Sequence, residues 1–569
     1  MTGNEIREKF LKFFEDRGHL ILPSASLIPQ DDPTLLLIGA GMAPFKPFFT
    51  GKMKPPSPRI ATCQKCVRTG DIENVGRTAR HHTYFEMLGN FSFGDYFKKE
   101  IIPWSWEFVT KELGIPADKL WITIHTEDDE AFDIWHNVVG LPEERIVRLE
   151  ENFWEIGSGP CGPCSEIHVD LGEERGCGKP TCAVGCDCDR FLEIWNLVFT
   201  QYNQNEDGTY TPLANKNIDT GAGLERLASV LQGKPSNFET DLIFPIIEYA
   251  SEVAAVEYGR ERKTDISLKV IADHARSMTF MIADGILPSN EGRGYVLRRI
   301  LRRAVRHGRL IGIDKMFLAG AVDVVIEMYG HVYPNLVEKR EYIQKVIEME
   351  ETSFLRTLRQ GSELLSDEIA KLEAAGATIL DGATAFKLND TFGFPWELTA
   401  EILEENGMTM DKAGFDAALE VQRKMAREAR DDKAGRPVIY NTRGIDIASL
   451  KVDEAADTGK IVMLYPAHDA QPIENAEDGK DVAVILDVTA FHAEGGGQLG
   501  DLGRITAPTG VIEVENTKKL PDGATIQIGR VVEGTVNVGD AVTYEVNSCR
   551  KSDIARNHTA THLLHAALK

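Results

Sequence analysis

The chain has 569 residues, with 63 lysines and arginines against 88 aspartates and glutamates, and a formal net charge of -25 at pH 7. This length is too great for one domain and indicates three or four, each able to bury a core of its own. The acidic balance excludes a protein that binds nucleic acid over its whole surface, so any such contact must come from local basic patches.

The apolar residues and the cysteines indicate in which cellular compartment the protein works. No signal-like or membrane-spanning apolar run occurs, and residues 1 to 16 form a charged, amphipathic stretch. Eight of the nine cysteines stand in short spacings, which is typical of thiols or metal ligands in an intracellular protein. We therefore expect a cytoplasmic protein with no membrane partner.

The patterning predicts an α+β multidomain protein. Strands, turns and helices alternate over 1–245, which predicts a domain with a mainly antiparallel sheet. A helical domain is predicted over 246–455, where the apolar residues recur with the period of a helix, most clearly up to residue 430. A polar stretch over 431–446, containing Gly435 and Pro437, predicts a linker. A β-rich domain is expected over 456–546 and a further domain from 547, with residues 549–569 returning to helix.

The first motif is a hairpin that carries an arginine and an aromatic ring. Residues 66–68 and 77–97 predict a strand, a loop and a returning strand, with Arg68 ending the first strand. The spacing of His81 and Phe85 would put both rings on one face of the second strand, where an adenine could stack on Phe85. The alternative is a hairpin with an aromatic core face. Glu86 could accept from an adenine edge or pair with a cation within the sheet.

Four cysteines follow within one loop that contains glycine and proline. Thiolates at such spacing suit tetrahedral Zn²⁺, and reduced loop cysteines without metal are an equally good interpretation. The four are Cys177, Cys182, Cys186 and Cys188.

Residues 217–232 place two glycines before an amphipathic helix. Gly221 and Gly223 lack the Cβ atoms that would keep a phosphate chain away from the backbone, and Arg226 in the first helical turn offers a planar cation. The alternative is a plain tight connection. Asp219, beside the glycines, could hold an ammonium group or cap the turn.

A strongly basic helix is predicted over 293–309. Its arginines either face an anionic ligand such as RNA or pair with carboxylates elsewhere in the chain. They are Arg293, Arg298, Arg299, Arg302, Arg303, Arg306 and Arg309.

His558 and His562 stand one helical turn apart near the end of the chain, a spacing that zinc sites use. Two ligands do not make a site, and a surface histidine pair is the alternative.

Together, the strand ending at Arg68, the strand with Phe85 and the Gly-x-Gly-x-Glu-Arg helix start resemble the second and third motifs of class II aminoacyl-tRNA synthetases. The likeness narrows to the alanyl-tRNA synthetase family, because further segments similar to that family run in one order from end to end of the chain. They are 32–36, 41–42, 81–98, 152–154, 159–164, 193–196, 288–291, 390–395 and 557–565.

The resemblance implies an ATP-dependent aminoacyl-tRNA ligase that uses Mg²⁺. It would convert L-alanine and ATP to alanyl-adenylate and pyrophosphate and then transfer alanine to the 3′ end of tRNA(Ala). Arg68 would hold the α-phosphate and Arg226 the γ-phosphate, so that the ATP residues are Arg68, His81, Phe85, Gly223 and Arg226. The alanine residues would be Met42, Trp154, Asn196, Asp219 and Gly221. Asn290 and Asp390 would read the acceptor stem, and the basic helix would add Arg293, Arg298 and Arg302.

The chain departs from the family pattern at two places. The loop after Arg68 lacks the family's lysine, for which Arg77 or Arg80 could substitute. The family's glycine-rich editing loop reads Ala493–Gln498 here, with Gly495 in place of serine. We expect a C-terminal truncation within the editing domain, so that His558 and His562 are part of an incomplete zinc site. We also expect a monomeric fragment that does not edit tRNA(Ala) mischarged with serine or glycine.

Two other functional classes compete with this interpretation. A tRNA-independent ATP-dependent ligase is disfavoured by the basic helix and by Asn290 and Asp390. A non-catalytic RNA-binding fragment is disfavoured because Arg68, Phe85, Asp219 and Arg226 are all present.

Overall fold

The structure is a computed structural model that describes residues 1–30, 32, 35–155, 159–186, 188–205, 207–422, 440, 442, 445–495, 497–520 and 522–568. Most of the predicted linker lies outside the described residues, as do positions 33 and 34 and Gly496 of the family-like segments. The chain divides into two compact units, Met1–Ala418 and Leu419–Lys569. The finer boundaries predicted at residues 245, 455 and 546 stay predictions.

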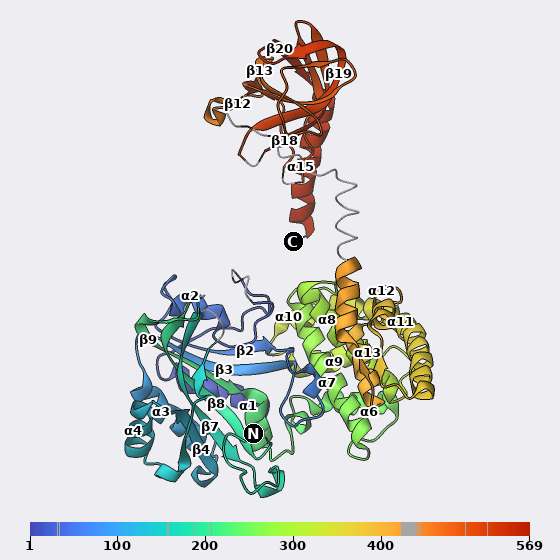
Figure 1. The fold of residues 1–569 in the computed structure, drawn as a ribbon. Helices are drawn as coiled ribbons and strands as arrows, with labels where there is room; N and C mark the ends of the chain where they lie inside the picture. Colours follow the sequence, from blue (N-terminus) through green and yellow to red (C-terminus); the bar gives the residue numbers. More distant parts are fainter. Residues whose placement is uncertain are drawn as a thin grey trace. The chain divides into compact units, whose positions relative to one another are not determined.

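The first unit is built on a nine-stranded sheet in the order β1-β2-β3-β9-β8-β7-β4-β5, with β6 beside β7 (Figure 1). The short edge pairs β1–β2 and β4–β5 are parallel, and the central pairs are antiparallel. The predicted mainly antiparallel sheet is therefore confirmed. The strands are β1 (Leu20–Ile21), β2 (Arg59–Val67), β3 (Tyr84–Phe93), β4 (Leu120–His125), β5 (Ile146–Leu149), β6 (Phe153–Trp154), β7 (Gly159–Asp170), β8 (Phe191–Gln204) and β9 (Tyr210–Gly223).

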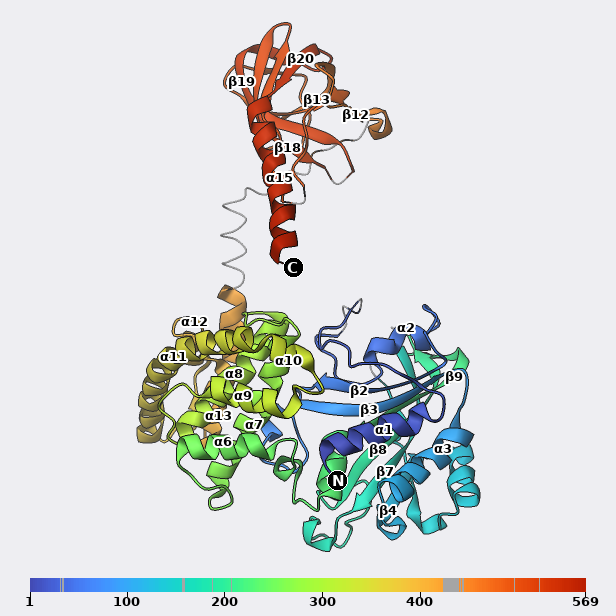
Figure 2. The same cartoon turned by 180° about the vertical axis from the view of Figure 1, so that it is seen from behind.

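Helices α1 (Gly3–Glu15) and α5 (Leu224–Leu231) pack on this sheet. Figure 2 shows α1 beside the strands. A capping box between Thr2 and Glu5 starts α1. Phe10 and Phe14 on its apolar stripe contact the ring of Trp195 in β8, with centroids 5.6 and 6.2 Å apart. The smaller helices of this part are α2 (Lys46–Phe49), α3 (Lys98–Glu107) and α4 (Asp129–Asp133).

A helical region follows the sheet, as predicted, and belongs to the same compact unit. Its α7 is buried along most of its length because it contacts β3 as well as α8 and α9. The helices are α6 (Phe244–Ala254), α7 (Arg262–Ala283), α8 (Gly292–Leu310), α9 (Leu318–Tyr329), α10 (Pro334–Glu338), α11 (Arg340–Ala375), α12 (Gly382–Asp390) and α13 (Trp396–Glu405); the strands β10 (Ile379–Leu380) and β11 (Thr409–Met410) pair beside them.

Two local predictions were wrong. β3 begins at Tyr84, so His81 lies in the loop before it and does not share a strand face with Phe85. The reason is that the N–H of Thr83 donates to Asp273 of α7 at 2.9 Å, although its carbonyl oxygen still accepts from the N–H of Arg68 at 2.9 Å. Gly221 and Gly223 are the end of strand β9 and do not form a turn.

A buried ion pair joins the helical region to the sheet. Arg276 of α7 donates at 2.7 Å to Glu225 in α5 and at 2.7 Å to the carbonyl oxygen of Tyr84 in β3. Glu225 also accepts the N–H of Glu86 at 3.1 Å. Glu86 itself is fully buried against Arg7 of α1, at 2.7 Å, which favours the ion-pair interpretation of this residue.

The second unit is a closed barrel. β19, β15, β13, β20, β17 and β18 follow one another, and β18 pairs again with β19. The β-rich prediction and the helix over 549–569 are confirmed. The elements are β12 (Lys451–Val452), β13 (Thr458–Pro466), β14 (Asn475–Glu477), β15 (Asp481–Leu486), β16 (Val488–Thr489), β17 (Gly503–Ala507), β18 (Gly510–Lys519), β19 (Thr525–Asn537), β20 (Ala541–Val546) and α15 (Ser548–Leu568).

No helix in the described part of the chain is both long enough and apolar enough to cross a membrane.

Replacing Arg276 by methionine should lower the free energy of unfolding by about 3 to 5 kcal/mol, because Glu225 would stay buried without its cation. Arg340→Ala is the control: Arg340 pairs with Asp323 while 53% exposed, and the loss should stay below about 1 kcal/mol. Urea unfolding followed by circular dichroism measures both. Equal losses in the two variants would contradict the role given to the buried pair.

Candidate active site

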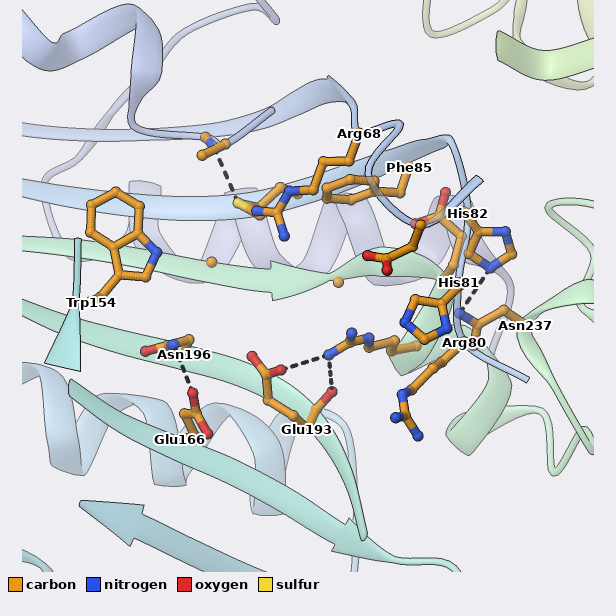
Figure 3. A pocket seen from close by; sticks show the side chains of 18 of the residues that line it. Arg68, Arg80, His81, His82, Phe85, Trp154, Glu166, Glu193, Asn196 and Asn237 are labelled. Carbon is orange, nitrogen blue, oxygen red and sulfur yellow. Dashed lines mark hydrogen bonds and ion pairs between the residues drawn. The ribbon is translucent and has the colours of Figure 1, made fainter. Parts of the chain in front are cut away.

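A cavity of about 370 Å³ opens over the sheet at β3, β8 and β9. Figure 3 shows Phe85, His81, His82 and Asn237 toward one end and Trp154, Asn196 and Glu166 toward the other. The lining residues are Ala40, Gly41, Arg68, Asp71, Arg80, His81, His82, Phe85, Met87, Trp154, Glu166, Glu193, Asn196, Val198, Asp219, Gly221, Gly223, Glu225, Arg226 and Asn237. Nine of the ten residues predicted for ATP and alanine, which are far apart in the sequence, line this one cavity; Met42 does not.

Arg68 and Phe85 lie together at the cavity wall. The Arg68 Nε donates to the carbonyl oxygen of Gly39 at 2.7 Å, and its guanidinium carbon lies 5.1 Å from the centroid of the Phe85 ring. This holds a planar cation beside a flat aromatic face. An anionic group and a planar ring could bind side by side here.

Arg226 projects from the first turn of α5 toward β8. It donates to the carboxylate of Glu193 at 2.8 Å and to the carbonyl oxygen of the same residue at 2.9 Å. The guanidinium plane is thereby fixed while the side chain stays 29% exposed.

Asp219 is a buried acid in the floor of the cavity. It lies in β9, paired with Val198 of β8 and Phe91 of β3, and is 6% exposed. Burial raises the pKa of Asp219 to about 7. A cationic ligand would restore its charge.

Asn196 faces Glu166 across the same end of the cavity. The Asn196 amide donates to Glu166 at 3.1 Å, and the other Glu166 oxygen accepts from Thr123 at 3.3 Å. With its Nδ2 so occupied, the buried Oδ1 of Asn196 has no hydrogen-bond partner among the described residues. An N–H donor on a ligand would satisfy it.

The prediction that Met42 walls the cavity was wrong. Met42 is 1% exposed and packs in an apolar cluster with Phe45 and Phe91. Its neighbour Gly41 lines the cavity in its place, and the N–H of Gly41 contacts the Met87 sulfur at 3.2 Å. A Cβ on Gly221 would come within 2.8 Å of that sulfur, so this glycine leaves space for Met87.

Several lining residues were not predicted. Glu166 and Glu193 each stand beside a buried apolar residue within a largely buried strand, a signal that indicates a charged residue with a local purpose. Met87, His82 and Asn237 have no such signal, because only the folded chain brings them to the cavity.

The arginines of α8 pair with carboxylates of the chain, which is the alternative interpretation of the basic helix. Glu350 of α11 binds both Arg298 and Arg302, at 3.1 and 2.9 Å. The further pairs are Arg299–Glu73, Arg303–Glu401, Arg306–Glu401, Arg306–Glu405 and Arg309–Asp314, while Arg293 donates to the carbonyl oxygen of Leu36. Contacts of Arg293, Arg298 and Arg302 with tRNA stay a prediction.

Two of these arginines also hold the segments predicted to read an acceptor stem. Arg298 donates to the side-chain oxygen of Asn290, and Arg302 donates at 3.2 Å to the carbonyl oxygen of Gly393, just after Asp390. Asn290 and Asp390 are both exposed.

The four loop cysteines converge. The sulfur atoms of Cys177, Cys182, Cys186 and Cys188 all lie within 4.8 Å of one another, and two of the distances are 3.7 Å. A tetrahedral zinc ion with bonds of about 2.3 Å requires sulfur separations of about 3.8 Å, so this donor set fits zinc. Among the described residues, this is the one group of three or more metal-binding side chains.

His558 and His562 lie on one face of α15, with ring centroids 4.9 Å apart, and both are exposed. Their assignment as zinc ligands stays a prediction.

Residues 5–550 match the family model described as tRNA synthetases class II (A). The chain belongs to this family. The chain is also similar to curated proteins named alanine–tRNA ligase. That of Thermoanaerobacter sp. (strain X514) is 56% identical over 570 residues, and that of Pelotomaculum thermopropionicum is 54% identical over 577 residues. The matches cover 100% of this chain and 65% and 66% of those two proteins.

A solved histidyl-tRNA synthetase from S. aureus is also similar, at 12% identity and a TM-score of 0.26, over 41% of this chain and 67% of the other.

Replacing Asp219 by asparagine should raise the free energy of unfolding of this chain by up to about 4 kcal/mol at pH 8, and by less at pH 5. The reason is that the folded pKa of about 7 exceeds the ordinary value, so stability falls as pH rises through this interval and the full cost is present above pH 7. Thermal unfolding at both pH values measures the difference.

The matched control is Asp170→Asn. A hydrogen bond from Arg190 lowers the pKa of Asp170, so this substitution should instead destabilise the chain at pH 8. The same change in melting temperature at pH 5 and pH 8 for Asp219→Asn would contradict the raised pKa.

Proposed function

We propose that this chain is the ligase part of an alanine–tRNA ligase: it activates L-alanine with ATP and transfers the alanyl group to tRNA(Ala). The observation that carries the proposal is that one cavity holds two unlike ends. One end offers a flat ring with arginines, and the other offers a buried acid and an amide. The names of the relatives support the choice of alanine.

The nucleotide end suits ATP. The adenine would stack on Phe85, Arg68 would bind the α-phosphate, and Arg226 would bind the γ-phosphate with the donors that Glu193 leaves available. His81 and Gly223 complete the wall. Because Arg68 and Arg226 are held by hydrogen bonds before ATP arrives, they can stabilise charge that develops on the phosphates without reorganising.

The other end suits an amino acid with a small side chain. The carboxylate of Asp219 would pair with the ammonium group, and the Asn196 oxygen would accept one of its N–H donors. Trp154 and Gly221, with Met87 packed against the glycine, would border the methyl group. The alanine carboxylate would then attack the α-phosphorus in line and expel pyrophosphate, and a hydroxyl of the tRNA 3′ end would take the alanyl group in a second step.

Glu193 would hold Mg²⁺ together with the ATP phosphates, since this ion is commonly bound by one or two carboxylates plus phosphate oxygens. The ion would neutralise charge on the phosphates. Glu193 lines the cavity beside Arg226, which is where the phosphates would lie in this arrangement.

The acceptor stem of tRNA(Ala) would be read by Asn290 and Asp390, with Arg293, Arg298 and Arg302 nearby. Exposed amide and carboxylate groups can pair with base edges in the wide RNA minor groove.

A pocket for alanine cannot firmly exclude serine, and it rejects glycine only through one methyl group worth about 1 to 3 kcal/mol. The full-length protein would therefore edit serine and glycine errors. We place the protein in the cytoplasm and expect this chain by itself to be monomeric.

Alanine-dependent exchange between ATP and pyrophosphate, measured without tRNA, tests the first step. Exchange should be stronger with alanine than with glycine or serine. It should fall by at least about a hundredfold in Arg68→Ala and Asp219→Ala, because each removes a group that stabilises the transition state or holds the substrate. Arg340→Ala, a surface change on α11, should keep the wild-type rate. A folded chain with no exchange for any amino acid would leave an RNA-binding fragment as the better account.

The cysteine loop should bind about one zinc ion per chain, because four thiolates at tetrahedral distances form a closed structural site. Cys182→Ser should lose the ion, whereas Cys549→Ser, in an exposed position on α15, should retain it. Elemental analysis after desalting measures the metal content. Equal zinc in both variants would contradict the assignment.

A further inference from the structure

A chain of contacts between buried charged and polar side chains leads from the cavity to the basic helix α8. Its central member is Asp273 of α7, which is fully buried. Asp273 accepts the N–H of Thr83 at 2.9 Å and the hydroxyl of the same residue, and it lies 3.3 Å from Nδ1 of His82. His82 lines the cavity and is followed directly by Thr83 and by β3.

The chain continues from Asp273 toward α8. His274 Nδ1 donates to Asp273 at 2.9 Å, and Arg303 Nη1 donates to the opposite ring nitrogen of His274 at 3.2 Å. The other amino group of Arg303 reaches Glu401 of α13 at 3.3 Å. His274 is fully buried and Arg303 is 5% exposed. The chain of contacts therefore runs His82, Asp273, His274, Arg303 and Glu401 without a solvent gap.

The pKa shifts of Asp273 and His274 fit these contacts. Although burial disfavours its charged form, the imidazoles of His274 and His82 hold the pKa of Asp273 below its ordinary value. Burial lowers the pKa of His274, which keeps that ring neutral and leaves one nitrogen free to accept from Arg303. At the other end, the Asn237 amide contacts Nε2 of His82 at 3.0 Å. His82 is thus held by this contact and by its covalent link to Thr83, while its Nδ1 faces Asp273 at 3.3 Å without a hydrogen bond.

A second contact joins the same segment to α8. Glu73 stands in the loop between Arg68 and His81 and pairs with Arg299 at 2.8 Å, while Arg303 lies 4.0 Å from its other oxygen. The loop that closes the nucleotide end is therefore attached to α8 at its middle and, through Asp273, at its end.

We propose that Asp273, His274 and Arg303 are positioning residues, through which α8 sets the orientation of His82 and Thr83 at the nucleotide end of the cavity. None of the three lines the cavity. The alanine end, at Trp154 and Asn196, has no part in this chain of contacts. The inference rests on the proposed function only in taking ATP as the ligand of that end. It predicts that a change on α8 alters ATP binding selectively.

The test compares Arg303→Gln with Arg306→Gln in the full chain. Arg306 is the matched control, because it lies on the same helix, is 4% exposed and also pairs with Glu401. Its ion-pair partners among the described residues are Glu401 and Glu405, and it makes no hydrogen bond with His274 there. Fluorescence titration with a labelled ATP analogue gives the Kd, and exchange kinetics give separate KM values for ATP and alanine. Thermal unfolding shows that both variants are folded.

Arg303→Gln should raise the Kd and the KM for ATP by about three- to tenfold, while the KM for alanine changes less than about twofold. Arg306→Gln should leave both KM values within about twofold of the wild type. Arg303→Lys should restore part of the ATP affinity. In a His82→Ala background, Arg303→Gln should have no further effect on ATP binding, because the route to the cavity is already cut.

Additive effects of His82→Ala and Arg303→Gln would overturn the proposal. So would an unchanged ATP affinity in a folded Arg303→Gln chain, or equal losses of ATP and alanine affinity in Arg303→Gln and Arg306→Gln. A wild-type chain that binds the ATP analogue but shows no alanine-dependent exchange would refute the ligase function and leave the binding test of the positioning residues intact.

Discussion

The ion pair between Glu225 and Arg276 is the constraint on which the rest of the first unit depends. Glu225 begins α5 directly after the strand that carries Asp219 and Gly221, and Arg276 stands in the middle of the buried helix α7. The same guanidinium also binds the backbone of β3 beside Phe85. Two desolvated charges are stable together only in a well-fixed geometry. The pair therefore sets where the nucleotide motifs and the helical region lie relative to one another.

Some polar groups in the cavity have hydrogen-bond partners within the protein, and others do not. Arg68 and Arg226 already have hydrogen-bond acceptors, which orients them, whereas Asp219 is buried with a raised pKa and Asn196 has an unpaired oxygen. Buried polar groups without partners cost stability. A ligand with an ammonium group would pair with both, and this cost would then be recovered on binding.

Acidic residues of the helical region and of the loop before β3 form ion pairs with the basic helix α8. Arginines crowd α8, and carboxylates from α11, α13 and the loop before β3 neutralise them. One carboxylate often serves two arginines, as Glu350 and Glu401 do, so the helix keeps an excess of positive charge in a chain of negative net charge. Under the proposed function, this local positive charge would attract RNA, and the negative net charge would discourage RNA binding elsewhere on the surface.

The sequence by itself determined the mainly antiparallel sheet, the helical region and the β-rich part, because these follow from periodicity. Local motifs and the resemblance to the family identified nine of the twenty residues that line the cavity. The sequence also placed four cysteines close enough to share a metal. Only the tertiary structure decided that Gly41 and not Met42 reaches the cavity, that His81 precedes its strand, and that the arginines of α8 have carboxylate partners. It also decided the raised pKa of Asp219 and the contact between Asp273 and Thr83, which are 190 residues apart in sequence. Burial and long-range pairing depend on how distant segments pack, and no local pattern of residues records that packing.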